Sequence, residues 1–308
     1  MKILILKKKI IINIIVIICL LFLFLIVFYL TSSKFTSIQT IYPLNFSKDI
    51  QYDLTGDGVK DTIETIDGQN QIDFNIKSLD KDYYLSKQID DKILFTINNH
   101  WSPKVFIHDI SRDSIPEIII QGSKNNKGVN YIFSWDKKKF SLISSTNKNI
   151  LGILDCKNTQ TPQCYSISSS EGISSLNSFM LINGNILDTT SENPTVPSLD
   201  SVTSFINLIE IPYNLDETPD IFTTSINSDE LSLLWNLDKD NFSYTFQNAF
   251  FYDYEWNNSG EPTAIKWRLS FEKNKLKGSI NDKTEFVVLV DVVKSNSSYK
   301  ISSIQKSK

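Results

Sequence analysis

Cysteine, histidine and the familiar catalytic motifs are scarce in this sequence. Its 308 residues include three cysteines and two histidines, too few to suggest a zinc or haem centre built from thiolates or imidazoles. The chain also lacks a Gly-x-Ser-x-Gly elbow, a His-Glu-x-x-His pair and a phosphate-binding glycine loop. We therefore predict that the protein is not an enzyme.

Positive charge is scarce beyond the first thirty residues. The whole chain has 31 basic and 35 acidic residues and a net charge of −4. Residues 1–30 contain four lysines and no acid, so residues 31–308 hold 27 basic and 35 acidic side chains, a net charge of −8. An acidic surface does not neutralise phosphates, and no nucleic-acid partner is expected.

A long apolar run near the N-terminus predicts the compartment. Residues 10–30 are apolar except for Asn13 and Tyr29. At about 1.5 Å per residue the run can cross a hydrocarbon core of about 30 Å, and it exceeds the roughly 7–15 apolar residues of a cleavable signal peptide. Three lysines at 7–9 should stay in the cytoplasm. We predict that residues 1–35 are a cytoplasmic tip and a single-pass signal anchor in the cell membrane, with residues 31–308 extracytoplasmic; a long signal peptide cut near Ser33 is the alternative.

Three segments of the extracytoplasmic part resemble one another. Residues 53–61 read DLTGDGVKD, residues 109–117 read DISRDSIPE, and residues 155–163 read DCKNTQTPQ. Their starts are separated by spacings typical of propeller blades. A short apolar run precedes each segment and a strand-like run follows it, and two more strands are expected at 130–135 and 140–144, and again at 177–182 and 185–188. Each unit therefore has the content of a four-stranded blade.

This pattern resembles the FG-GAP/VCBS-type repeats of bacterial surface proteins over residues 38–197. In that family the loops bind calcium, and many members act in adhesion or ligand binding outside the cell. The resemblance implies a mainly β fold with a propeller-like repeat domain at 36–192. Three units are fewer than the roughly four blades of the smallest ordinary propeller. A partial propeller, a divergent propeller and an open stack of sheets are therefore all alternatives.

The first loop has the chemistry of a calcium site. Ca²⁺ prefers about 6–8 oxygen ligands, and the glycines at 56 and 58 let the backbone turn tightly. The flanking residues alternate like strands, which argues against an EF-hand. The predicted ligands are the side chains of Asp53, Thr55, Asp57 and Asp61 and the carbonyl of Val59. A solvated acidic turn is the alternative.

The second and third loops depart from this pattern. A weaker calcium site is predicted from Asp109, Ser111, Asp113, Glu117 and the carbonyl of Ile115. Its alternative is a metal-free turn, since arginine and serine replace the two glycines. In the third loop, Cys156 and Cys164 form either a disulfide or two reduced core cysteines.

The last third of the chain shows helical and then strand-like patterns. Residues 193–198 read as a linker and residues 199–308 as an α+β domain with a curved antiparallel sheet. Ser198 and Ser228 are the expected caps of two helices, and a short helix is expected after Pro219. The expected strands are 241–256, 264–271, 285–293 and 299–304. The order resembles NTF2-like or cystatin-like domains.

Aromatic residues at even positions from 242 to 256 predict one aromatic sheet face. Either this face packs under the helices or it forms a ligand-binding surface. The candidate ligand face comprises Tyr252, Tyr254, Trp256 and Trp267.

Together these observations predict a membrane-anchored, extracytoplasmic, calcium-binding repeat protein without catalytic activity. Its expected partner is an unidentified protein or glycan ligand at the cell surface. Two alternatives are an anchored cell-envelope hydrolase with structural calcium, and a sensor or assembly partner of another membrane protein.

Overall fold

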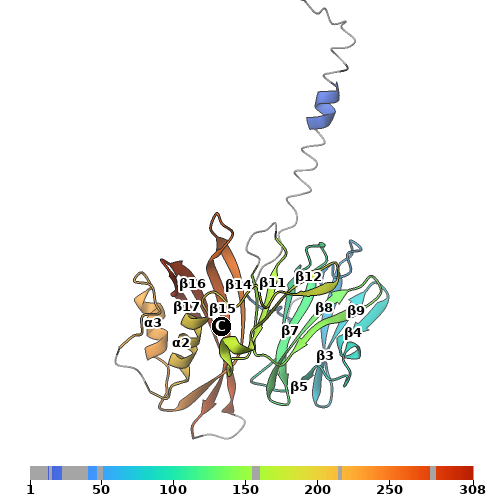
Figure 1. Cartoon of the computed structure of the whole chain (residues 1–308). Helices are drawn as coiled ribbons and strands as arrows, with labels where there is room; N and C mark the ends of the chain where they lie inside the picture. The colour runs from blue at the N-terminus through green and yellow to red at the C-terminus, as the bar shows by residue number, and fades with distance from the viewer. Residues whose placement is uncertain are drawn as a thin grey trace, which may run out of the picture. The chain divides into compact units, whose positions relative to one another are not determined.

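The computed structural model describes residues 13, 16–22, 41–46, 51–154, 160–213, 217–277 and 282–307. The chain divides into two units, residues 1–38 and residues 39–308 (Figure 1). In the first unit, residues 13 and 16–22 are helical. No helix within the described residues is long and apolar enough to cross a membrane. Most of the predicted anchor at 10–30 lies outside those residues.

The second unit is mainly β. Its first sheet is antiparallel and places β1 to β4 in chain order, with β5 also paired to β3. The second sheet is an antiparallel meander in the order β6-β7-β8-β9. The strands of these two sheets are β1 (Gln51–Tyr52), β2 (Asp61–Asp67), β3 (Gln71–Ser78), β4 (Lys81–Tyr84), β5 (Phe95–Thr96), β6 (Lys104–His108), β7 (Glu117–Lys124), β8 (Lys127–Trp135) and β9 (Phe140–Thr146).

The third sheet has eight strands in the order β13-β12-β11-β10-β14-β15-β16-β17. β10 and β14 run parallel, and every other neighbouring pair is antiparallel. The strands are β10 (Ile150–Leu154), β11 (Gln163–Ile167), β12 (Asn177–Ile182), β13 (Asn185–Asp188), β14 (Phe242–Trp256), β15 (Pro262–Lys275), β16 (Thr284–Ser295) and β17 (Ser298–Lys306). The expected linker at 193–198 thus lies between two halves of one continuous sheet. Short 3₁₀ helices occupy η1 (Leu85–Gln88) and η2 (Gly172–Ser175).

Three hydrophobic cores separate four layers. In β7, Ile118 and Ile120 face the core shared with the first sheet, while Ile119 faces the core shared with the third sheet. The second sheet is therefore buried on both faces, and Figure 1 shows β7 and β8 between β3 and the C-terminal strands. The described strands form an open stack and do not close into a propeller. The four-stranded content of the units at 104–146 and 150–188 agrees with the sequence prediction.

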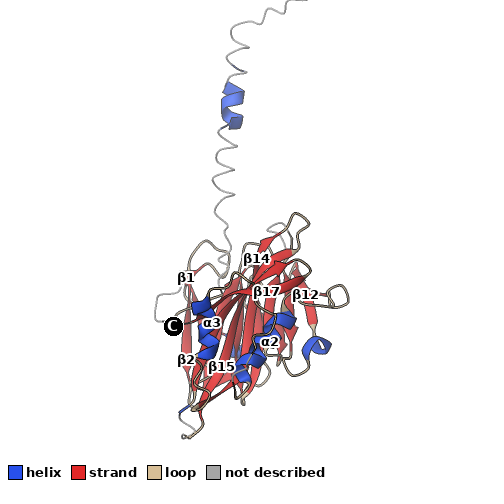
Figure 2. Ribbon diagram, turned by 90° about the vertical axis from the view of Figure 1, so that its left-hand side faces the viewer, coloured by secondary structure: helices blue, strands red, loops and turns tan. Residues whose placement is uncertain are grey.

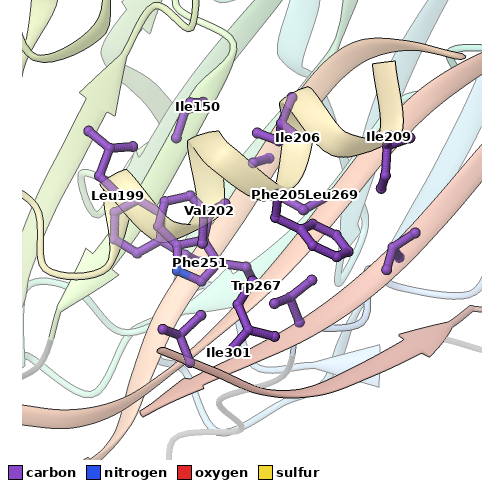
Figure 3. Close-up of a cluster of buried hydrophobic side chains, with 14 of the residues drawn as sticks. Ile150, Leu199, Val202, Phe205, Ile206, Ile209, Phe251, Trp267, Leu269 and Ile301 are labelled. Atoms are coloured by element: carbon purple, nitrogen blue, oxygen red, sulfur yellow. The ribbon is translucent and has the colours of Figure 1, made fainter. Parts of the chain in front are cut away.

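Two helices, α2 (Leu199–Glu210) and α3 (Ser228–Trp235), cover the outer face of the third sheet (Figure 2). The apolar stripe of α2 packs on a stacked pair formed by Trp267 and Phe251, whose ring centroids are 4.2 Å apart (Figure 3). Burying this stripe orients the helix, since large apolar side chains gain roughly 1.5–3 kcal/mol each on burial.

Two local predictions about the helices are wrong, and a third holds in position only. Ser198 stands at the N-cap of α2 as predicted, with a φ of 70°, but its side chain makes no capping hydrogen bond; its hydroxyl instead accepts from the Trp267 indole at 2.9 Å. The cap of α3 is Asn227, whose side chain accepts from the amide of Asp229. The segment after Pro219 is not helical, because the backbone at Phe222 bridges to Ile301 at the open edge of β17.

Candidate functional site

The first loop, between β1 and β2, is folded by its own acidic side chains. The two carboxylate oxygens of Asp53 accept hydrogen bonds from the amides of Gly56 at 2.7 Å and Gly58 at 2.9 Å. These glycines have φ values of 72° and 83°, which side-chain-bearing residues rarely adopt. Asp57 accepts from the amide of Val59 at 2.8 Å. The carboxylates of Asp53 and Asp57, at positions 1 and 5 of the loop, therefore hold a tight turn.

Within the described part of the chain, two buried oxygens of this loop have no hydrogen-bond partner. Asp61 is fully buried; its Oδ2 accepts from the amide of Leu54 at 2.7 Å, while its Oδ1 accepts nothing. The hydroxyl of Thr55 is also buried and unpaired. An unsatisfied buried polar atom costs about 1–3 kcal/mol, and more when it is charged. Hard oxygen atoms of this kind are the ligands that Ca²⁺ prefers.

The second loop, between β6 and β7, repeats the first residue by residue. The amide of Ser114 donates to Asp109 at 3.1 Å, and the amide of Ile115 donates to Asp113 at 2.9 Å. Glu117 accepts from the amide of Ile110 at 2.8 Å, as Asp61 does in the first loop. Arg112 and Ser114 have φ values of 61° and 71° without being glycines. The two loops therefore share one backbone conformation, as their sequence similarity predicts.

The second loop differs at the acid that ends it. The free oxygen of Glu117 accepts from the hydroxyl of Ser134 at 3.2 Å, so this carboxylate has no unsatisfied oxygen. Burial raises its pKa to about 7. Burial also raises the pKa of Asp109. Ser134 lies on β8, far from the loop in sequence, and nothing in the local pattern points to it. The first loop thus retains the better donor set for a cation.

The loops lie next to one another. The backbone of Gly56 packs against the side chain of Ile115, and Arg112 Nε donates to the carbonyl of Gln160 in the third segment at 3.2 Å. The fourth residue of each loop, Gly56 in the first and Arg112 in the second, therefore contacts the loop that follows it in the chain. Residues 155–159 lie outside the described residues, as does the predicted Cys156–Cys164 pairing. Cys164 itself is fully buried in β11, and burial raises its pKa.

The carboxylates of the first loop point to backbone amides and not to one shared point. Within the described ranges, no three acidic, histidine or cysteine side chains lie close enough together to hold a single ion. The donor types fit calcium, and the unpaired oxygens of Thr55 and Asp61 are the observation that favours a cation. Bringing Asp53 and Asp57 to the same ion would require their side chains to leave the backbone amides that they now bind.

The predicted aromatic ligand face is not a single face. A bulge between Phe246 and Asn248 reverses the alternation of β14. Tyr244 therefore faces the helices, whereas Phe250 and Tyr252 face the second sheet.

The four candidate ligand-face residues are accordingly not brought together. Trp267 is fully buried under α2, and Tyr252 packs on the other side of the sheet. Trp256 donates to Asp253 at 2.6 Å, and Lys266 lies 5.5 Å from the ring centre of Tyr254.

Neither histidine lies in one of the predicted calcium loops' ligand sets; one is buried and the other joins two segments of the fold. His108 is buried beside the second loop, and burial lowers its pKa to about 4. His100 contacts Glu272 at 2.9 Å and joins the segment before β6 to β15. A partly buried network nearby links Arg268, Glu285 and Lys104, and the Lys104–Glu285 ion pair is 2.8 Å long. These contacts hold the second sheet to the third, and sequence reasoning did not anticipate them because their members are distant in the chain.

Compared with family models, curated proteins and solved structures, the chain shows no significant match.

Proposed function

We propose that this chain is a membrane-anchored, extracytoplasmic protein whose 53–61 loop binds Ca²⁺ and whose stacked sheets bind a protein or glycan ligand at the cell surface without catalysis. The proposal includes kinship with FG-GAP/VCBS repeats and an NTF2-like or cystatin-like sheet in the C-terminal part. The single observation that carries the calcium assignment is the pair of buried, unpaired oxygens on Thr55 and Asp61.

A bound calcium ion would serve a structural role. It would satisfy the two unpaired oxygens and reduce repulsion among the three carboxylates of the loop. Extracellular calcium sites work with dissociation constants of about 10⁻⁴ to 10⁻³ M. An ion that binds only the folded state at a hundredfold excess stabilises it by about 2.7 kcal/mol.

The test is a calcium titration of the purified full-length chain after dialysis against EDTA. Calorimetry measures the heat of binding, and thermal unfolding measures the melting temperature. Asp61→Asn is nearly isosteric, can still accept from the amide of Leu54, and removes the unpaired carboxylate oxygen. We expect it to abolish calcium binding and the calcium-dependent rise in melting temperature.

Asp113→Ala in the second loop is the control, because it removes the counterpart of Asp57 from the loop whose closing carboxylate, Glu117, is already satisfied. It should leave most of the calcium response intact. The proposal fails if millimolar calcium produces neither heat nor a melting shift, or if Asp61→Asn responds like the unmodified protein.

A further inference from the structure

A pocket of about 440 Å³ opens beside the first loop. Thr55 and Asp57 of that loop form one side, and the β3–β4 turn and the end of β8 form the others. Because loops 53–61 and 109–117 precede β2 and β7, while β3 and β8 run back towards them, the pocket lies at the loop end of the first two sheets. Its size falls within the roughly 300–1,000 Å³ of small-molecule sites.

Two aromatic rings form the wall of this pocket. Tyr83 and Trp135 are half-buried, with ring centroids 5.3 Å apart and ring planes at 84°. Behind them lies the fully buried ring of Phe140, at 5.7 Å from Tyr83 and 5.0 Å from Trp135. The wall therefore consists of two aromatic rings that meet edge to face, backed by a buried third ring.

The rim of the pocket carries uncommitted charges of both signs. Asp80, Lys81 and Lys137 line it, and all three are exposed. Within the described part of the chain, no ion pair or hydrogen bond engages these three side chains. With Asp57 the pocket of the calcium-free chain has two acids and two bases, so its formal charge is zero. A balanced set of donors and acceptors favours a neutral, polar ligand over an anion or a cation.

Leu79, at the β3–β4 turn, supports a binding role. It lines the pocket, is 73% exposed, and has a φ of 50°. A non-glycine residue in the left-handed region costs about 1–2 kcal/mol, and the exposed leucine side chain recovers none of this by burial. Backbone positions strained in this way cluster at active sites and ligand clamps.

We propose that this pocket binds a neutral pyranose unit of a polysaccharide. The apolar face of the sugar ring would pack on Tyr83 and Trp135, and its hydroxyls would donate to Asp80 and accept from Lys81 and Lys137. The proposal rests on the proposed function, since it names the ligand class of a surface-binding protein. It does not require the calcium ion to contact the sugar.

The test uses the full-length chain and a panel of soluble dextran, mannan, galactan and chitin oligosaccharides at millimolar concentration, with binding followed by saturation-transfer NMR and calorimetry. At least one member should bind. Asp80→Asn should weaken that binding about tenfold, the loss expected for one charge-assisted hydrogen bond. Trp135→Leu should abolish it.

Lys139→Gln is the matched control, because Lys139 is exposed in the turn that follows Trp135 but does not line the pocket. It should bind like the unmodified protein, and the melting temperature of each variant shows whether it is folded. Asp80→Asn changes only an exposed side chain and keeps the test valid if Trp135→Leu does not fold.

The sugar proposal is overturned if no oligosaccharide of the panel binds, or if Asp80→Asn and Lys139→Gln bind equally well. Binding of tryptic casein peptides without any saccharide binding would identify a peptide site instead. Calcium titration of the same samples keeps the two proposals apart. A protein that binds calcium but no sugar contradicts only the pocket assignment.

Discussion

The backbone of Gly56 lies directly against the side chain of Ile115, so the first loop is packed on the second. A Cβ atom added to Gly56 would stand 2.6 Å from Cδ1 of Ile115, and Gly56 has a φ of 72°. This position is therefore constrained twice, by backbone conformation and by space. Gly58 has a similar φ of 83°, but no atom of the described residues lies within 4 Å of a Cβ added there.

This pair of glycines allows a matched test of loop stacking. Gly56→Ala should destabilise the fold by about 2–5 kcal/mol, because overpacking of about 1–3 kcal/mol adds to the left-handed backbone cost of about 1–2 kcal/mol. Gly58→Ala should cost only the backbone term, about 1–2 kcal/mol. Urea unfolding of both variants measures the difference. Equal losses of unfolding free energy in the two variants would mean that the side chain of Ile115 moves away from the added methyl group without measurable cost.

Gly152 tests whether the third sheet unfolds as one piece. An added Cβ would stand 2.1 Å from Phe251, whose strand β14 pairs with β10. Gly152→Ala should destabilise residues before and after 193–198 together, by about 1–3 kcal/mol. Hydrogen exchange of β11 and β16 reports the two halves separately. Faster exchange in β11 alone would show that the halves open independently.

Glu117 should make stability depend on pH when calcium is removed with EDTA. Its pKa is raised to about 7 in the folded chain, against 4.5 for an ordinary glutamate. The folded state therefore binds more protons in this window, and the free energy of unfolding falls as pH rises from about 4.5 to 7. Glu117→Gln cannot titrate, so this part of the slope should disappear.

Urea titrations of both proteins across that pH range isolate the Glu117 contribution from that of His108. The pKa of His108 is lowered to about 4 in the folded chain. The unfolded chain therefore binds more protons at this histidine, and its contribution to the free energy of unfolding rises with pH, opposite to that of Glu117. Identical slopes for the unmodified protein and Glu117→Gln would show that Glu117 keeps an ordinary pKa.

The anchor prediction has a direct biochemical test. Protease added to intact cells should remove the part of the chain beyond residue 31, while the purified protein retains its N-terminal lysine-rich segment. N-terminal sequencing and mass spectrometry distinguish the two forms. Recovery of a released chain beginning near Lys34 would identify a cleaved signal peptide instead.

The candidate site could be predicted from sequence only where it is local. The acids of the first loop accept hydrogen bonds from amides two to seven residues away. The spacing of these acids in the sequence therefore predicts the turn. Ser134 and Trp135 reach the loop end from β8 through strand pairing, and no local pattern reveals them. The prediction of a single aromatic face was wrong because a bulge after Phe246 reverses the alternation of side chains along β14.

Local chemistry by itself determined where most strands and both helices lie. Apolar alternation located β6 to β13 and β14 to β17, and the stripe beginning at Leu199 located α2, because these patterns depend on neighbours within a few residues. Tertiary structure alone decided that β10 pairs with β14, that Ile115 covers Gly56, and that the three sheets form an open stack. Such contacts join residues far apart in the chain, and their choice depends on which apolar faces remain to be buried once the elements have formed.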